Sequence, residues 1–356
     1  EPAFPCTASK YYLYSMSRLY RSDALNFISK LTVRRVANAL QLWSSYQLSR
    51  LIRRPIHWGN PFSISIEPTT SCNLRCPECP SGLRAFTRPT GMLHTDFFRN
   101  TIDQLHRDLT YLVFYFQGEP YLNPDFLDMV KYAADKNIYT ATSTNAHYLN
   151  DENAKRTIES GLDRLIISID GTTQDVYQQY RVGGKLDKVL EGTRNIVRWK
   201  KELKSKTPFI VFQFLVVKPN EHQIEEVQEL GKSIGVDAVW LKTAQIYDYE
   251  NDPNGLIPSL DRFSRYKRTA AGTRFKGNIT NSCWRLWQDP VITWDGLVAP
   301  CCFDKDATHQ LGDLKAQSFA EIWRSPTYRT FRKKLWSGRK QIDICSNCSE
   351  GTKVWG

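Results

Sequence analysis

No stretch of this 356-residue sequence is apolar over the roughly 18 residues that a membrane-spanning helix needs. The first twenty residues lack the apolar core of a secretory signal, and the chain contains no low-complexity tract or short-period repeat. No basic segment combines with aromatic residues in a known nucleic-acid-binding module, so nucleic acid is not an expected partner. We therefore expect a soluble, cytoplasmic protein of about two domains.

Cysteine is scarce outside two short groups. Of the nine cysteines, Cys72, Cys76 and Cys79 form the first group, five between positions 283 and 348 form the second, and Cys6 stands alone. A chain of this size needs no disulfide staples, and the odd number of thiols favours a reducing compartment. Clustered thiols in such a compartment indicate metal or redox chemistry.

Acidic residues are scarce in residues 1–60, which contain nine Lys or Arg and only two acidic residues. The net charge of this segment is +7, out of +11 for the whole chain. Apolar residues recur there at helical spacing: Val36, Leu40, Trp43, Leu48, Leu51 and Ile52. The segment predicts a basic, helical N-terminal arm. Two roles stay open, a helical cap packed on the next domain with its charges solvated, or docking on an anionic membrane surface or a phosphorylated substrate.

Between residues 62 and 243, β-rich runs alternate with helical runs. We expect strands at 63–69, 111–116, 139–144, 164–169, 209–217 and 238–243, and helices within 94–108, 124–137, 150–161, 185–203 and 221–235. Near-continuous apolar strands separated by helices indicate a parallel sheet. Six β/α units are too few for a closed eight-stranded barrel, so the expected fold class is α/β, with a partial (β/α)6 TIM-like barrel over 61–245.

The alternation stops after residue 243. Residues 246–356 are expected to form a linker and a small cysteine-rich domain, with short strands in "VITWDGLVAP" and one helix over 318–336. The chain thus divides into an arm (1–60), a barrel (61–245) and a C-terminal domain (246–356).

Three thiols in the first group are one fewer than a structural zinc site takes. Thiolate clusters select zinc or iron–sulfur clusters, and four-iron clusters are usually held by four cysteines in short runs. Three cysteines would hold three irons and leave the fourth open to another ligand. The group directly follows the first expected strand, at the C-terminal end of the barrel strands, where the active sites of such barrels lie.

The C-x3-C-x2-C run of Cys72, Cys76 and Cys79, placed after the first strand of a partial barrel, resembles the radical S-adenosylmethionine superfamily. The resemblance covers about residues 62–243. It implies that the open iron binds S-adenosylmethionine, that reductive cleavage yields a 5′-deoxyadenosyl radical, and that this radical abstracts a hydrogen from the substrate. It also implies a reductant such as flavodoxin or ferredoxin.

Two further segments resemble cofactor-contacting turns of that family. Gly118 and Glu119 in "FQGEP" are similar to its Gly-Gly-Glu turn, which meets the methionyl amino group, with Gln117 in place of the first glycine. Ser143 and Asn145 in "TSTNAH" are similar to the end of its third strand. A turn or capping role is the alternative for this second pair.

After the fourth strand, the resemblance implies that Ser168 reaches the ribose or the methionine and that Arg181 pairs with the cofactor carboxylate. A structural salt bridge is the alternative for Arg181. The sequence departs from the family at Glu78, where an aromatic residue is common, and it has no match to the glycine motif at the fifth strand.

The second cysteine group resembles the SPASM/twitch extension that follows many barrels of this family. Its C-x12-G-x4-C spacing and closing C-x2-C pair imply an auxiliary 4Fe–4S cluster held by Cys283, Cys301, Cys345 and Cys348, with Gly296 at the hairpin bend. Five cysteines instead of seven favour the twitch-like version with one cluster. Paired ligands across a hairpin also suit zinc. The spacing from Gly296 favours Cys301 over Cys302 as the ligand.

Several functions fit these residues. We expect an oxidoreductase that dehydrogenates a sugar-like or aminocyclitol small molecule and passes the electron to the auxiliary cluster. A ribosomal-peptide maturase, and a peripheral membrane enzyme acting on a lipid or lipid-linked sugar, are the alternatives. A non-catalytic electron carrier would have no use for Glu119 and Arg181. No catalytic base is assigned.

Overall fold

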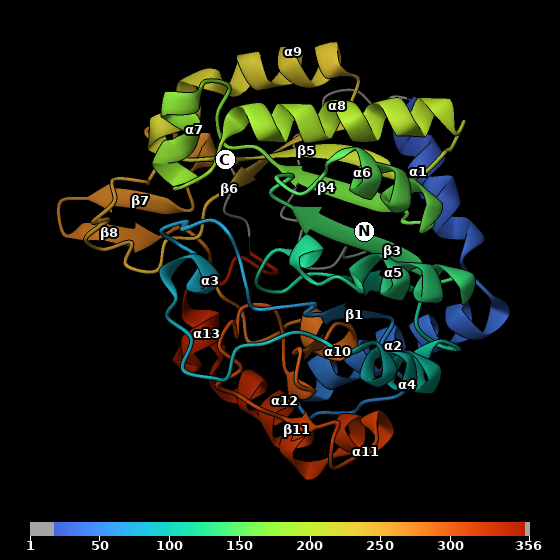
Figure 1. The fold of residues 1–356 in the computed structure, drawn as a ribbon. Helices are drawn as coiled ribbons and strands as arrows, with labels where there is room; N and C mark the ends of the chain where they lie inside the picture. Colours follow the sequence, from blue (N-terminus) through green and yellow to red (C-terminus); the bar gives the residue numbers. More distant parts are fainter. Residues whose placement is uncertain (1–17, 353–356) are drawn as a thin grey trace.

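Six parallel strands follow one another in chain order in the computed structural model, which describes residues 18–352 (Figure 1). They are β1 (Ser63–Ile66), β2 (Tyr111–Val113), β3 (Tyr139–Thr144), β4 (Arg164–Ser168), β5 (Phe209–Val216) and β6 (Ala238–Thr243). Every expected strand is present, although β1 and β2 are shorter than predicted. The parallel order confirms the expected α/β partial barrel.

Helices connect the strands and cover the outer face of the sheet (Figure 1). The five expected ones are α4 (Thr95–Leu105), α5 (Phe126–Asp135), α6 (Asp151–Glu159), α8 (Leu186–Glu202) and α9 (Ile224–Ile234). The short α3 (Pro80–Leu83) and α7 (Gln174–Tyr180) were not predicted. Seven residues or fewer give too little periodicity to separate a helix from a loop.

Alternate residues of each strand face opposite sides of the sheet. On β5, Ile210, Phe212 and Phe214 join the large core that the outer helices cover, whereas Phe209 and Val211 join a separate cluster inside the barrel. Both faces are therefore apolar, which explains the near-continuous hydrophobic runs in the sequence.

Helix α1 (Arg18–Ser29) closes the N-terminal end of the barrel. Its Asp23 is buried and bonds to Arg164 and to the hydroxyl of Tyr139, the first residues of β4 and β3. Phe27 packs edge-on against Tyr139, with ring centroids 5.4 Å apart. The arm therefore includes the predicted helical cap, whereas Cys6 lies outside the described residues.

Helix α2 (Val33–Ile52) buries a largely polar face and exposes an apolar one. Arg35 is 3% exposed and donates to the backbone carbonyls of His106 and Asn137, at the ends of α4 and α5. The outward side chains include Val33, Val36, Leu40, Trp43, Leu51 and Ile52. This arrangement reverses the usual orientation of an amphipathic surface helix.

The C-terminal region extends the barrel sheet. β9 (Val291–Ile292) pairs in parallel with β1, and β10 (Leu297–Ala299) and β11 (Gly312–Asp313) follow as antiparallel strands. The sheet is thus continuous across the predicted domain division near 245. β7 (Tyr266–Thr269) and β8 (Gly272–Phe275) form a separate hairpin that projects from the body in Figure 1.

The prediction of a single helix over 318–336 is wrong. The chain forms α11 (Phe319–Arg324) and α12 (Pro326–Gly338), separated by Ser325 in an extended conformation. A residue before proline is disfavoured in the helical conformation, and proline suits the first position of a helix. The Ser325 side chain accepts a hydrogen bond from Tyr328 N at 3.1 Å and caps α12.

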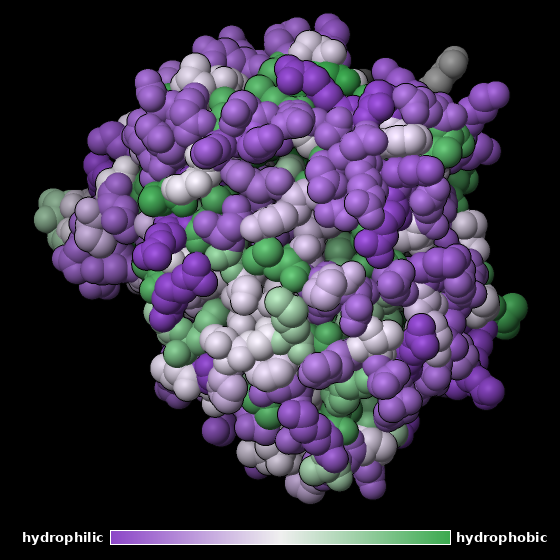
Figure 2. Space-filling model, viewed as in Figure 1, coloured by the Kyte–Doolittle hydropathy of each residue, from purple (hydrophilic) through white to green (hydrophobic). Residues whose placement is uncertain are grey.

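No helix among residues 18–352 is both long enough and apolar enough to cross a membrane. The face seen in Figure 2 is mostly hydrophilic over α7, α8 and α9, and apolar side chains gather below these helices.

Candidate active site

The first three thiols lie on the loop that follows β1 and ends in α3. Leu74 is 1% exposed and packs among Val217, Ala244 and Ile246, so it anchors the loop to the ends of β5 and β6. Arg75 N donates to the carbonyl of Val182 at 2.9 Å, which ties the loop to the segment after α7. The thiols are therefore placed at the C-terminal ends of the strands, as predicted.

Burial favours the protonated form of Cys72 and Cys76 when no metal compensates their charge. It raises the pKa of Cys72 to about 11 and also raises the pKa of Cys76. The nearby donors favour the thiolate form: Leu74 N lies 3.4 Å from the sulfur of Cys72, and Arg181 Nη1 lies 3.7 Å from that of Cys76. A bound cationic centre would make three adjacent thiolates stable.

Glu119 is buried just beyond β2 and accepts three hydrogen bonds. Its carboxylate accepts from Thr144 Oγ1 at 2.7 Å, Asn145 N at 2.8 Å and Tyr121 N at 3.4 Å. Burial nevertheless raises the pKa of Glu119 to about 7. Gly118 before it has φ +76°, and a Cβ there would lie 2.1 Å from the carbonyl oxygen of Thr69, so glycine is required.

Ser143 and Ser168 come from neighbouring strands, and their hydroxyl oxygens are 3.4 Å apart. Asn145 Nδ2 donates to Asn73 Oδ1 at 2.8 Å and lies 3.9 Å from the sulfur of Cys72. The Asn145 side chain also accepts from His147 N at 3.1 Å. Asn145 therefore stabilises a turn, as the alternative prediction had it, and also lies close to the thiols.

Arg181 forms a structural salt bridge, which the sequence analysis gave as the alternative to pairing with the cofactor carboxylate. Its Nε lies 2.5 Å from Asp170 Oδ2, while Nη1 faces the sulfur of Cys76. Asp170 is fully buried, and its other oxygen accepts from Leu215 N on β5 at 2.7 Å. The salt bridge thus holds the guanidinium against the thiol loop.

One cavity of about 150 Å³ is lined by every residue that the resemblance singled out around the first cluster. The set comprises Cys72, Cys76, Cys79, Gly118, Glu119, Ser143, Asn145, Ser168 and Arg181. Their individual roles stay predictions. Sequence reasoning missed Tyr115 and Tyr180, which also line the cavity. Tyr180 is the first residue of the segment "YRVGG" that contains Arg181, and Tyr115 follows the second strand more closely than Gly118 does.

The second thiol group is brought together by the C-terminal hairpin. β9 and β10 turn at Gly296, where φ is +95°, and Cys301 follows β10. Burial and the thiols of Cys345, Cys348 and Cys283 raise the pKa of Cys301. The four predicted auxiliary ligands are therefore neighbours in space.

A superfamily profile for radical SAM proteins matches residues 66–237, and a profile for the SPASM iron–sulfur cluster-binding domain matches residues 283–349. The two matches cover both thiol groups. The chain belongs to the radical S-adenosylmethionine superfamily. It is a radical SAM enzyme, and its two domains imply S-adenosylmethionine and 4Fe–4S clusters, with an auxiliary cluster in the C-terminal domain.

Several proteins of similar sequence or fold align with most of this radical SAM chain. The tungsten-containing aldehyde ferredoxin oxidoreductase cofactor-modifying protein of Pyrococcus furiosus is 26% identical over 80% of this chain and 86% of its own length. The PqqA peptide cyclase of Rhodopseudomonas palustris is 26% identical over 82% of this chain and 80% of its own. The crystal structure of BtrN in complex with AdoMet and 2-DOIA has the same fold, with a TM-score of 0.52, 19% identity, and coverage of 83% and 95%.

The profile matched by residues 283–349 describes an iron–sulfur cluster-binding domain, and the radical SAM profile over residues 66–237 covers the first three thiols. Both matches support iron–sulfur clusters rather than single zinc ions at the two thiol groups.

Arg339 supplies positive charge at the auxiliary thiols. It is fully buried, its Nη2 lies 3.4 Å from the sulfur of Cys348, and its Nη1 donates to the carbonyl of Ser282 at 2.8 Å. Cys302 lies instead in an apolar cluster with Val291 and Ala299. Of the two adjacent cysteines, only Cys301 therefore joins the auxiliary group.

Glu78 stands directly before Cys79, where the family commonly has an aromatic residue. It connects the thiol loop to the segment after β6. It is 8% exposed and accepts from Tyr247 N at 2.8 Å. Burial raises the pKa of Glu78, and Lys305 of the auxiliary domain acts in the opposite direction.

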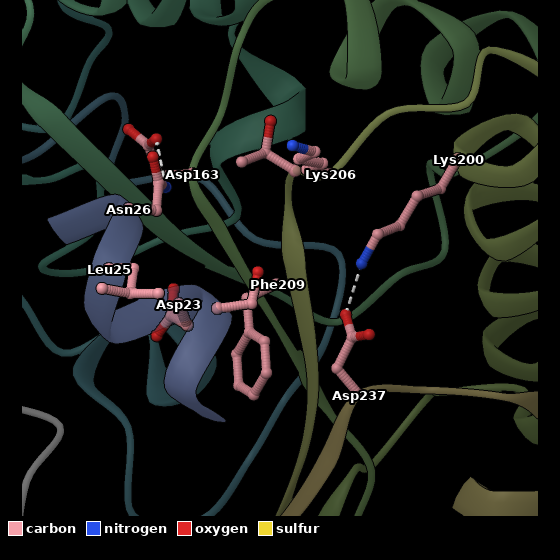
Figure 3. Close-up of a pocket in the computed structure, with 10 residues that line it drawn as sticks. Asp23, Leu25, Asn26, Asp163, Lys200, Lys206, Phe209 and Asp237 are labelled. Atoms are coloured by element: carbon pink, nitrogen blue, oxygen red, sulfur yellow. Dashed lines mark hydrogen bonds and ion pairs between the residues drawn. The ribbon is translucent and has the colours of Figure 1, made fainter. Parts of the chain in front are cut away.

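A larger cavity, of about 310 Å³, lies at the opposite end of the strands (Figure 3). Most of its charged groups are already paired: Lys200 lies 2.6 Å from Asp237, and Asp163 accepts from Asn26 at 2.8 Å and pairs with Lys30 at 3.2 Å. No cysteine lines it. The smaller cavity, next to the thiols, is therefore the candidate site.

Proposed function

We propose that this radical SAM enzyme oxidises a small polar molecule of the sugar-like or aminocyclitol class by removing two hydrogens. The proposal depends mainly on one observation, the gathering of Cys283, Cys301, Cys345 and Cys348 beside the buried Arg339. Four protein thiols leave no vacant iron for a substrate, so a cluster there serves to accept an electron.

At the first site, Cys72, Cys76 and Cys79 would hold a four-iron cluster, and Glu119, Asn145, Ser168 and Arg181 would hold S-adenosylmethionine. When bound, S-adenosylmethionine supplies the hydrogen-abstracting radical. Arg181 places a positive charge where a carboxylate of the cofactor can pair with it, and Asp170 holds the guanidinium in that position. A small electron-transfer protein such as flavodoxin or ferredoxin would supply the electrons.

A peptide substrate is the second candidate, because a relative 26% identical over 82% of this chain is named as a peptide cyclase. The BtrN structure, which shares the fold, contains 2-DOIA beside AdoMet and favours a small molecule. The described part of the arm offers two helices rather than a small sheet for peptide binding.

The test is reconstituted enzyme supplied with reductant, S-adenosylmethionine and a panel of sugars, aminocyclitols and short peptides. The parent enzyme is expected to form 5′-deoxyadenosine and a product lacking two hydrogen atoms. The Cys301→Ala variant is expected to lose about four of about eight irons and to cleave S-adenosylmethionine without releasing oxidised product, because its electron acceptor is missing.

Cys302→Ala is the matched control, since it removes the adjacent cysteine, whose side chain packs with Val291 and Ala299 outside the group. It is expected to keep all the iron and to form product. Oxidised product from the Cys301→Ala variant would refute the relay, and turnover of a peptide alone would favour the second candidate.

The outward face of α2 supports a further proposal, that the enzyme docks on an anionic membrane surface. Leu40 is 60% exposed, Trp43 is 54% exposed and Leu51 is 81% exposed, all on the outward face of one helix. Arg53 and Arg54 are exposed at its C-terminal end. Apolar side chains beside exposed arginines are complementary to a bilayer with negative headgroups. Exposing the same apolar side chains to water is unfavourable.

The Leu40→Gln, Trp43→Gln double variant is expected to pellet with phosphatidylglycerol vesicles at least about tenfold more weakly than the parent, since each side chain contributes about 1.5–3 kcal/mol when buried in lipid. Salt should weaken binding of the parent. Leu260→Gln removes a leucine that is 39% exposed outside the arm and should change nothing. Equal pelleting of parent and double variant would contradict the proposal, and a parent dimer that the double variant loses would assign the stripe to a second copy.

A further inference from the structure

The turn that follows β2 is bonded to the thiol loop on both sides of the three cysteines. Gly118 N donates to Ser81 Oγ at 2.9 Å, and Glu119 N donates to the carbonyl of Ser71 at 2.8 Å. Ser71 and Ser81 flank the three thiols in the sequence. The backbone of Gln117, one residue before this turn, is therefore held at a fixed place beside the thiols.

Gln117 is 6% exposed, and its side-chain amide lies at the third thiol of the group. The sulfur of Cys79 is 3.6 Å from Gln117 Oε1, so the thiol can donate a weak hydrogen bond to this oxygen. Within residues 18–352 neither the Cys79 sulfur nor the Gln117 amide has another hydrogen-bond partner. No second bond from these residues therefore fixes which end of the amide faces the sulfur.

The other two sulfurs of the group already face N–H donors. Leu74 N lies 3.4 Å from the sulfur of Cys72, and Arg181 Nη1 lies 3.7 Å from that of Cys76. Cys79 faces an oxygen, which accepts from a thiol but repels a thiolate. A cysteine that binds iron is a thiolate and has no hydrogen to donate. The contact between Cys79 and its neighbour must therefore change when iron is bound.

The Gln117 amide can make this change by a half-turn about its terminal side-chain bond. That torsion is soft in glutamine, and the oxygen and nitrogen ends of the amide have nearly the same size. After the half-turn, Nε2 stands where Oε1 stood and points an N–H at the sulfur. Each of the three thiolates then accepts a charge-assisted hydrogen bond from a nitrogen.

We propose that Gln117 donates a hydrogen bond from Nε2 to the Cys79 thiolate of the first cluster and thereby raises the reduction potential of that cluster. Hydrogen bonds to the sulfurs are among the factors that set the potentials of iron–sulfur clusters. The added electron increases the negative charge on the sulfurs, so the bond stabilises the reduced form more than the oxidised form. The glycine that stands at this place in the family's turn has no side chain to make such a bond.

Gln117 is a positioning residue, because it acts through Cys79. Its hydrogen bond makes the transfer of an electron from a flavodoxin or ferredoxin to the first cluster more favourable. The proposal concerns the potential of that cluster and does not depend on which substrate the enzyme oxidises.

The test compares the parent enzyme with the Gln117→Leu variant by redox titration of both reconstituted holoenzymes, followed by EPR, without S-adenosylmethionine or substrate. The signal of the first cluster is the one missing from a variant with alanine at Cys72, Cys76 and Cys79. Leucine fills a similar volume but has no N–H to donate. The equilibrium constant for one-electron reduction is expected to fall about tenfold, which lowers the midpoint potential by about 59 mV.

The auxiliary cluster is the internal control, and its midpoint potential should stay the same. Asn123→Leu is the matched variant, because Asn123 is 3% exposed and its amide donates to the carbonyls of Pro68 and Leu93 at 2.9 and 3.0 Å. It should lower the urea midpoint of unfolding and change neither potential. An unchanged first-cluster potential in Gln117→Leu would overturn the proposal, and so would an equal shift in Asn123→Leu.

A second measurement uses the unaltered chain, labelled with ¹⁵N in the side-chain amides of glutamine. Pulsed EPR of the reduced first cluster is expected to show coupling to ¹⁵N, because an N–H···S bond transfers unpaired spin to the nitrogen. The donors to Cys72 and Cys76 are a backbone amide and an arginine, which carry no label, so the coupling identifies Gln117. Absence of the coupling would overturn the proposal even if Gln117→Leu fails to bind the first cluster.

Discussion

Replacing Cys72, Cys76 and Cys79 together by alanine is expected to abolish cleavage of S-adenosylmethionine and to lower the iron content from about eight to about four per chain. All three thiols line the cavity beside Glu119 and Arg181, and no other cysteine lines it. Without them nothing holds the iron that the cofactor would bind. Iron analysis and chromatography of 5′-deoxyadenosine check both parts.

The variant should remain folded, because Cys72 and Cys79 are half-buried and Leu74 still anchors the loop. Its remaining iron should belong to the auxiliary group, and the Cys301→Ala variant should show the reciprocal loss. Appreciable 5′-deoxyadenosine from the triple variant would mean that the cofactor reacts elsewhere. Loss of all iron would mean that the two groups do not assemble independently.

Asp170→Asn is expected to destabilise the enzyme by about 3–5 kcal/mol, because it leaves the half-buried Arg181 without its fully buried counter-charge. Asp170 accepts from Arg181 on one oxygen and from Leu215 N on the other. Asparagine has one acceptor oxygen and one donor group, so it can satisfy only one of these donors. Arg181 should then leave its position beside Cys76, and S-adenosylmethionine cleavage should fall with the stability.

The matched control is Asp237→Asn at the opposite end of the barrel. Asp237 also pairs with a basic residue, Lys200 at 2.6 Å, and also accepts from a β5 amide, Ile210 N at 2.7 Å. Urea unfolding should show destabilisation of both variants, and cofactor cleavage under folding conditions should fall only for Asp170→Asn. Equal cleavage by the two variants would mean that Arg181 does not need Asp170 to function.

The order of the barrel strands could be predicted from the sequence, and so could the common location of the residues that the family resemblance assigns to the cofactor. Apolar runs bounded by turns mark strands because both faces of a parallel sheet are buried. The motif positions around Glu119, Ser143 and Ser168 meet in one cavity because the C-terminal ends of parallel strands lie at one edge of the sheet.

Other features depend on contacts between distant segments. The pairing of β9 with β1 could not be predicted, since two residues give no periodicity and the partner lies more than 220 positions away.

The sequence by itself determined the α/β barrel, the two thiol groups and the radical chemistry, because strand periodicity and cysteine spacing are local properties of the chain. The tertiary structure decided which side of α2 faces outward and which of Cys301 and Cys302 joins the auxiliary thiols. These depend on burial, and burial is set by segments that are far apart in the sequence and pack together only in the folded chain.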